Sequence, residues 1–186
     1  INNIELDHVD YFPTIESYVA SFEKFANQVK DTVIVWGDDP YLPKLNYTKR
    51  CVMFGLGEKN DVRAVNFIEN KDGMSFDVYI HRELFGHFNL PFFGKHILMD
   101  TLAVITLGYL EGMEADFIQS RLATFEGVKR RYTVTEHDDC IYVDDYAHHP
   151  TAVKFVIEAT KVRYPNKPII ALFKPDRFSR IKQFAK

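Results

Sequence analysis

The sequence has few cysteines, no long apolar run and no excess of basic charge, and each shortage excludes a class of protein. Its 186 residues include two cysteines, Cys51 and Cys140, which lie far apart and match no metal-binding spacing. Both fall in apolar, strand-like runs, so we expect reduced, buried thiols of a cytoplasmic protein. No stretch is long and apolar enough to cross a bilayer, and no signal segment opens the chain. The formal net charge of -3 gives no electrostatic reason to expect nucleic acid as a partner.

Two other absences bear on whether the sequence is a whole protein. The sequence contains no Gly-x-x-x-x-Gly-Lys-[Ser/Thr] loop, which commonly cradles nucleotide phosphates. It opens on Ile1 rather than methionine, and its last residues have a helical pattern. We therefore expect a piece of a longer protein. With 46% hydrophobic and 26% charged residues, this piece can still bury one sizeable core or two small ones.

Apolar periodicity predicts an α/β fold in the first part of the chain. Thr14 is the expected N-cap of a helix whose apolar stripe runs from Ile15 through Phe25 to Val29. Short apolar runs predict buried parallel strands, and a period-two pattern predicts an antiparallel meander. We expect strands at residues 32–36 and 51–54, the meander at residues 62–90, and helices at residues 94–109 and 115–124.

The character of the chain changes at residues 125–131, which are basic and contain glycine. We place a domain boundary here, giving one domain over residues 1–126 and another over residues 127–186. The second domain is predicted to hold strands at residues 132–136 and 140–143, a helix from Pro150 to Arg163, and a strand from Ile169 to Phe173. The last strand would complete a βαβ unit with a right-handed crossover.

The octapeptide Asp144-Asp145-Tyr146-Ala147-His148-His149-Pro150-Thr151 is the most informative segment. It places two carboxylates and two imidazoles between a strand and a helix. Ligands of open α/β sheets bind at the carboxyl ends of strands, and the amino end of the following helix attracts anions. The alternative is that the acidic residues cap the helix and that the histidines form a solvated surface feature.

This octapeptide resembles a signature of the Mur ligases, and three other segments support the same family. Residues 3–10 are similar to its Asn-x-x-x-Asp-His-x-Asp stretch, residues 94–100 to its Gly-x-His-Asn-x-x-Asn segment, and residues 173–180 to its Phe-Gln-Pro-His-x-[Phe/Tyr]-[Ser/Thr]-Arg segment. Nearly the whole chain is covered. The resemblance implies an α/β fold: the later part of a P-loop-type central ATP-binding domain with the meander, then the first part of a Rossmann-like C-terminal domain.

The resemblance also implies a reaction. Such a ligase would join L-alanine to the lactyl carboxylate of UDP-N-acetylmuramate, through an acyl phosphate formed with ATP and Mg²⁺. Without a phosphate loop and a uridine-nucleotide domain, residues 1–186 alone are expected to be inactive.

The family pattern assigns a nucleotide side to the site. It makes His8 a metal ligand, places His96 and Asp100 beside the adenine, directs Arg131 at the ATP phosphates, and puts Asp145 on the nucleotide side. Arginine suits phosphoryl oxygens because it is planar and permanently charged. Ile97 and Asp100 replace the two asparagines of the family segment. A carboxylate can only accept hydrogen bonds, so the loss should weaken adenine binding by about 1–3 kcal/mol. A capped helix without nucleotide contact is the alternative.

Other positions are assigned to the substrates and the chemistry. Tyr146 and His148 would line the substrate pocket, and Arg180 could hold a carboxylate or phosphate bidentately. Arg131, His148 and Arg180 are the expected catalytic residues, whereas His149 would support the loop.

Lys174 and Asp176 replace the family's glutamine and histidine. A carboxylate at Asp176 would repel an anionic substrate unless Lys174 or Arg177 offsets it. Two alternatives remain open: a murein-peptide recycling ligase that uses the same sugar nucleotide, and a ligase-like binding module that has lost catalysis.

Overall fold

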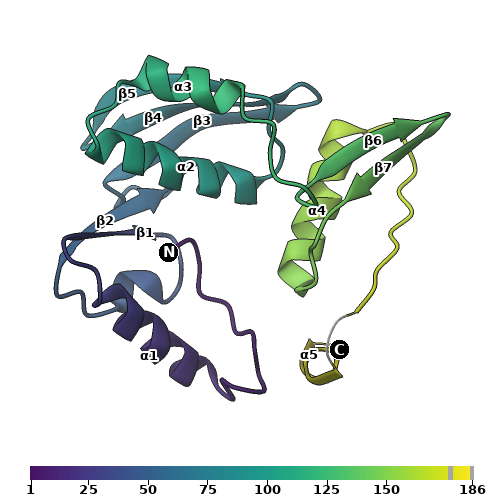
Figure 1. Ribbon diagram of the computed structural model, residues 1–186. Helices are drawn as coiled ribbons and strands as arrows, with labels where there is room; N and C mark the ends of the chain where they lie inside the picture. Colours follow the sequence, from purple (N-terminus) through teal and green to yellow (C-terminus); the bar gives the residue numbers. More distant parts are fainter. Residues whose placement is uncertain (176–177, 185–186) are drawn as a thin grey trace.

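The computed structural model describes residues 1–175 and 178–184, which form a larger lobe and a smaller one (Figure 1). The larger lobe is built on a five-stranded sheet in the order β1-β2-β3-β4-β5, and the smaller one carries the two-stranded sheet β6-β7. The strands of the first sheet are β1 Thr32–Trp36, β2 Arg50–Gly55, β3 Val62–Asn70, β4 Gly73–Ile80 and β5 Glu83–Leu90. The first three strands run parallel and the last three antiparallel, so the α/β fold class and the meander are confirmed.

Helices cover both faces of this sheet. Helix α2 (Lys95–Leu110) and helix α3 (Ala115–Ala123) pack on one face (Figure 1). The side chains of Leu98, Leu102 and Ile105 recur at helical spacing along α2 and are fully buried against the sheet. Burying each such side chain contributes roughly 1.5–3 kcal/mol.

Helix α1 (Ile15–Ala26) packs on the opposite face, against β1 and the short helix η1 (Leu42–Lys44). Thr14 caps α1 as predicted, with its hydroxyl accepting from the Ser17 backbone N–H at 3.3 Å. Phe25 departs from the predicted apolar stripe because its side chain is 59% exposed on the outer face of the helix.

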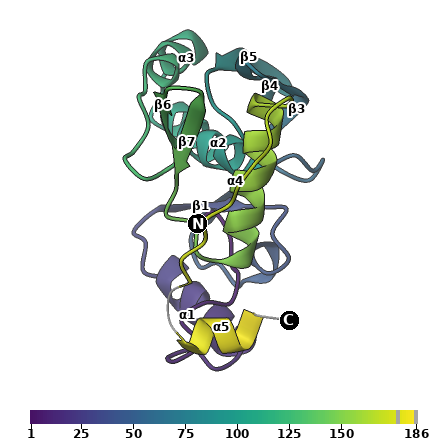
Figure 2. The ribbon, with the colours of Figure 1, turned by 90° about the vertical axis from the view of Figure 1, so that its right-hand side faces the viewer.

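The smaller lobe contains β6 (Thr133–His137), β7 (Cys140–Asp144) and α4 (Pro150–Arg163), and the last helix is α5 (Phe178–Phe184). Strands β6 and β7 form an antiparallel hairpin. Both strands and α4 match the predicted elements. Figures 1 and 2 show α5 far from the hairpin.

The predicted strand Ile169–Phe173 is wrong. These residues have no regular secondary structure, and the side chains of Ile170 and Leu172 are 87% and 96% exposed. A parallel strand exists only through hydrogen bonds to a neighbour, and β7 pairs only with β6 among the described residues. The predicted βαβ crossover is therefore not formed in residues 1–175 and 178–184.

The cysteines are both unpaired, but only Cys51 is partly buried, whereas Cys140 is exposed. The prediction of a buried thiol is thus wrong for Cys140, because its strand β7 is covered by too little structure. No helix in the described part of the chain is long and apolar enough to cross a membrane.

Candidate functional site

The loop before α1 meets the C-terminal part of the chain through an ion pair between Asp7 and Arg180. The Arg180 Nη2 atom donates to the Asp7 Oδ1 and Oδ2 atoms at 2.8 and 3.1 Å, and its Nε atom donates to Oδ1 at 3.1 Å. Arg180 is 6% exposed, so its guanidinium is largely removed from water. Burial alone would raise the pKa of Asp7. Hydrogen bonds from the His8 backbone and from Arg180 outweigh it, and the pKa is lowered.

The octapeptide loop joins the same loop through its histidines. His148 Nε2 lies 3.9 Å from the Asp7 Oδ2 atom, and its Nδ1 atom lies 2.9 Å from the Tyr146 carbonyl oxygen. His149 Nδ1 lies 3.4 Å from the Glu5 Oε2 atom, and its ring packs on Phe184 of α5 at 4.8 Å between centroids. His149 thus contacts Glu5 and α5, and its expected role in supporting the loop stays a prediction.

A second group of predicted residues gathers where α2 meets α4. His96, in the first turn of α2, stacks on Phe155 of α4 with 5.5 Å between ring centroids. Burial lowers the pKa of His96, although Asp100, Asp145 and Glu69 favour its charged form. Its Nδ1 atom is buried and has no hydrogen-bond partner within residues 1–175 and 178–184.

Two of the three carboxylates near His96, those of Asp100 and Asp145, are already engaged. Asp145 accepts hydrogen bonds from the backbone N–H groups of Tyr132 at 2.8 Å and Ala147 at 2.7 Å. Asp100 accepts from the Asn2 side-chain amide. Asp145 therefore ties the end of β7 to the basic segment, which is a structural task in addition to any contact with a ligand.

Tyr146 contacts both the basic segment and His148. The guanidinium carbons of Arg130 and Arg131 lie 5.0 and 5.8 Å from the centre of its ring, and the His148 ring meets its edge at 5.2 Å. Such cation–π contacts hold cationic groups in place without neutralising them. A continuous series of contacts thus runs from Arg131 through Tyr146 and His148 to Asp7 and Arg180.

His8 lies at the edge of this series with a half-exposed side chain and a positive φ of 53°. Within the described residues, no three histidine, cysteine, aspartate or glutamate side chains gather closely enough to hold a metal ion. The residues present therefore do not form a magnesium site by themselves, and His8 could supply at most one ligand. Asp176 and Arg177, invoked to set the charge near the substrate, lie outside the described residues.

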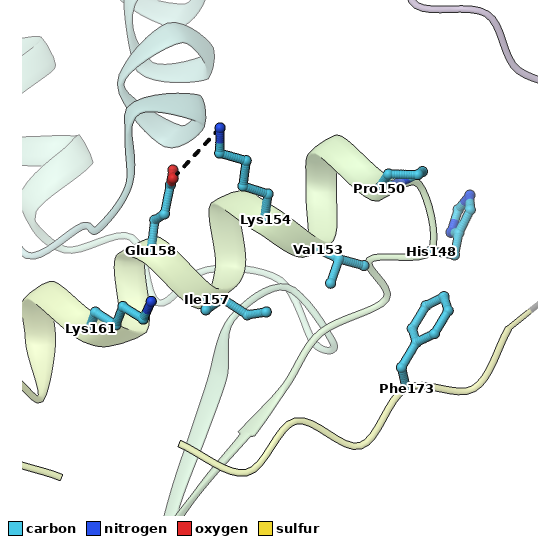
Figure 3. Close-up of a pocket in the computed structure, with 8 residues that line it drawn as sticks. All are labelled: His148, Pro150, Val153, Lys154, Ile157, Glu158, Lys161 and Phe173. Atoms are coloured by element: carbon cyan, nitrogen blue, oxygen red, sulfur yellow. Dashed lines mark ion pairs between the residues drawn. The ribbon is translucent and has the colours of Figure 1, made fainter. Parts of the chain in front are cut away.

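A hollow along α4 holds about 490 Å³ (Figure 3). Val153, Ile157 and Phe173 give it a mostly apolar wall, and only His148 belongs to the charged series of contacts. This hollow is a groove on one side of α4, distinct from the meeting point of α2 and α4.

Sequence reasoning missed several contact residues. Glu5, Asp7 and Thr151 lie inside the quoted motifs, so the motifs could have marked them as site residues. The sequence does not show which residues they contact. Phe155 lies outside any motif and was missed entirely.

Comparison with known proteins now decides the family. The model of the Mur ligase middle domain matches residues 1–108, and the model of the Mur ligase glutamate ligase domain matches residues 130–186. The chain belongs to the Mur ligase family. The family expected from the four motifs is confirmed.

Curated relatives make the similarity more specific. The chain is 42% identical to the UDP-N-acetylmuramate--L-alanine ligase of Lacticaseibacillus casei, over 99% of this chain and 42% of the relative. The corresponding ligase of Ligilactobacillus salivarius is also 42% identical, over 97% of this chain and 41% of the relative. The chain thus spans about two fifths of the length of the curated relatives that it matches.

A solved structure agrees with these relatives. The UDP-N-acetylmuramate-alanine ligase of Thermotoga maritima superimposes with a TM-score of 0.80 and 25% identity, over 98% of this chain and 42% of that one. A MurF ligase of the same organism, solved with ADP, has a TM-score of 0.71 at 21% identity, over 86% of this chain and 38% of that one, and shows the fold alone.

Proposed function

We propose that the whole protein is an ATP-dependent ligase that joins L-alanine to the lactyl carboxylate of UDP-N-acetylmuramate in the synthesis of peptidoglycan precursors. The observation that carries the proposal is identity of 41–42% to ligases of that name over nearly the entire chain. Residues 1–186 alone are expected to be inactive, since they contain no phosphate loop.

The proposed reaction needs cationic groups around phosphoryl oxygens and a holder for an anionic substrate. ATP would supply the phosphoryl group that activates the lactyl carboxylate for attack by the amine of L-alanine. Arg131, beside Tyr146, would face the ATP phosphates. Tyr146, His148 and Arg180 would orient the acid and the amino acid, because they lie together near Asp7.

Three residues assigned to the adenine side of the proposed site lie near one another. The unpartnered Nδ1 atom of His96 offers one polar group for a ligand between α2 and α4. Asp100 and Asp145 lie near it and would complete this side. Mg²⁺ would have to take ligands besides His8.

We further propose that residues 1–126 and 127–186 belong to two domains. The two family models support this division, because they match residues 1–108 and 130–186 and leave the interval that contains the boundary. The free thiols of Cys51 and Cys140 support a cytoplasmic location.

The test is a ligation assay with the whole protein, ATP and UDP-N-acetylmuramate. L-Alanine and the tripeptide L-alanyl-γ-D-glutamyl-meso-diaminopimelate are offered separately, and the amide product is identified by mass spectrometry. We expect turnover with L-alanine. Turnover with the tripeptide alone would assign the protein to murein-peptide recycling, and the absence of ATP binding in calorimetry would assign it to the noncatalytic class.

A further inference from the structure

The Asp7 carboxylate contacts two side chains that the proposed function assigns to the substrates. Its oxygens receive the forked guanidinium of Arg180 at 2.8–3.1 Å, and Oδ2 lies 3.9 Å from His148 Nε2. Arg180 and His148 come from α5 and from the octapeptide loop, 32 positions apart in the sequence. One carboxylate of the amino-terminal lobe thus fixes two separate elements of the carboxyl-terminal part.

Because Arg180 is buried, its ion pair with Asp7 should matter more for the position of α5 than an exposed ion pair would. An exposed ion pair contributes little, because water screens it and two long side chains must be ordered. Arg180 is instead 6% exposed, and Asp7 is also largely covered. Removing the charge of Asp7 takes from this buried arginine the carboxylate that accepts hydrogen bonds from two of its nitrogens, so its orientation is no longer fixed by that pair. A planar guanidinium held at two nitrogens is also fixed in orientation, which a lysine would not be.

Two further acidic residues of the same loop bind the same elements. Glu5 accepts a hydrogen bond from the Thr151 hydroxyl, and Asp10 accepts one from the Ser179 hydroxyl at 2.8 Å. We name Glu5, Asp7 and Asp10 the acidic strip. Figures 1 and 2 both show α5 beside the loop that leads from the N-terminus to α1, as these contacts require. Among the contacts of residues 1–175 and 178–184, Asp7 is the member of the strip whose carboxylate lies against side chains of both the octapeptide loop and α5.

We propose that Asp7 is a positioning residue, which holds Arg180 and His148 in one arrangement and thereby sets the substrate pocket from the amino-terminal lobe. The kinetic part of this inference rests on the proposed function. Its structural part, that Asp7 docks α5, does not. Asp7 itself need not touch a substrate, because it acts through the two side chains that it orients.

The experiment compares Asp7→Asn with the unsubstituted protein at its full natural length. Hydrogen exchange of residues 178–184 reports the docking of α5, and we expect it to accelerate about tenfold or more. The KM for UDP-N-acetylmuramate should rise, or kcat should fall, by about tenfold, while the KM for ATP changes less than about threefold. Asp7→Glu keeps the charge and should restore part of both effects.

Asp138→Asn is the matched control. It makes the same chemical change in the exposed His137–Asp138 pair of the β6–β7 hairpin and should alter neither readout. Arg180→Lys is the second variant, because it keeps a positive charge but lacks the fork, and it should reproduce the selective loss for the sugar nucleotide. Far-ultraviolet circular dichroism establishes that each variant is folded.

Unchanged exchange of residues 178–184 in both Asp7→Asn and Arg180→Lys would overturn the docking. Faster exchange with unchanged kinetic constants would overturn the positioning role. If the unsubstituted protein forms no amide at all, the proposed function fails, and hydrogen exchange still decides whether Asp7 docks α5.

Discussion

The imidazole of His96 lies nearly parallel to the ring of Phe155, with 13° between their planes and 5.5 Å between their centroids. This stack joins α2 of the larger lobe to α4 of the smaller one. A second contact joins the same two lobes. The guanidinium carbon of Arg163, at the end of α4, lies 4.5 Å from the centre of the ring of Phe93, which comes just before α2. The two lobes are therefore held together by aromatic packing at this end and by the acidic strip at the other.

Removing the Phe155 ring should weaken the contact between the lobes. We expect Phe155→Ala to lower the free energy of unfolding by about 1–2 kcal/mol, less than for a fully buried ring, because Phe155 is only half-buried. Urea denaturation measures the loss. Phe25→Ala removes the same ring from an exposed position and should cost less than about 0.5 kcal/mol. Equal losses in the two variants would contradict the assigned role of the stack.

Gly94 permits the close approach of α2 and α4. Its φ is +93°, and a Cβ atom there would lie 2.6 Å from the His96 ring and 3.3 Å from the Ala159 Cβ atom. We expect Gly94→Ala to destabilise the protein by more than about 2 kcal/mol, from backbone strain and steric overlap together. Gly112→Ala is the control. Gly112 also has a positive φ, of +77°, but a Cβ atom there would meet nothing within 4 Å, so only the backbone cost of about 1 kcal/mol should appear. A larger loss of stability in Gly112→Ala than in Gly94→Ala would contradict the explanation by steric overlap at Gly94.

Burial of His96 predicts a stability change with pH. Its pKa is lowered in the folded protein, so below its ordinary value of 6.5 the unfolded chain binds a proton more readily than the folded one. Stability should therefore fall as pH drops from about 7.5 through 6.5, and the fall should end below the folded pKa. Urea midpoints measured across this range should decline less in His96→Asn. An identical decline in both proteins would show that another group causes it.

Asp39 anchors the start of the loop that carries the acidic strip. Its buried carboxylate accepts hydrogen bonds from the backbone N–H groups of Ile4 at 2.9 Å, Tyr41 at 2.8 Å and Leu42 at 2.9 Å. Asp39→Ala would leave these groups unpaired, and we expect a loss of about 2–4 kcal/mol in thermal or urea unfolding. Asp39→Asn retains one acceptor oxygen and should lose less. A larger loss of stability in Asp39→Asn than in Asp39→Ala would contradict the proposed anchoring role of Asp39.

Local signals in the sequence were sufficient for most elements. The Thr14 cap, the period-two meander and the proline at the start of α4 each act within a few residues, and the structure agrees with them. The strand expected at residues 169–173 failed because a strand also needs a partner, which no local pattern supplies. The expected burial of Phe25 was wrong because this side chain lies on the outward side of α1, away from the residues that pack on the sheet.

The sequence identifies individual residues of the candidate site, but not which of these residues contact one another. The motifs marked His148 and Arg180, yet the partner of both is Asp7, which lies 173 positions before Arg180 in the chain. Only the fold brings such distant charges together. The roles of the site residues in binding and catalysis remain predictions, which the kinetic experiments address.

In the proposed reaction, the whole protein activates the lactyl carboxylate as an acyl phosphate. The most direct measurement uses UDP-N-acetylmuramate labelled with ¹⁸O in that carboxylate, with ATP and L-alanine, and analyses the released inorganic phosphate by mass spectrometry. One carboxylate oxygen bonds to the transferred phosphorus and leaves with it when the amine attacks the carbonyl carbon. We expect one ¹⁸O atom in the phosphate for each amide formed from doubly labelled acid. Amide formation with unlabelled phosphate would contradict the proposed reaction.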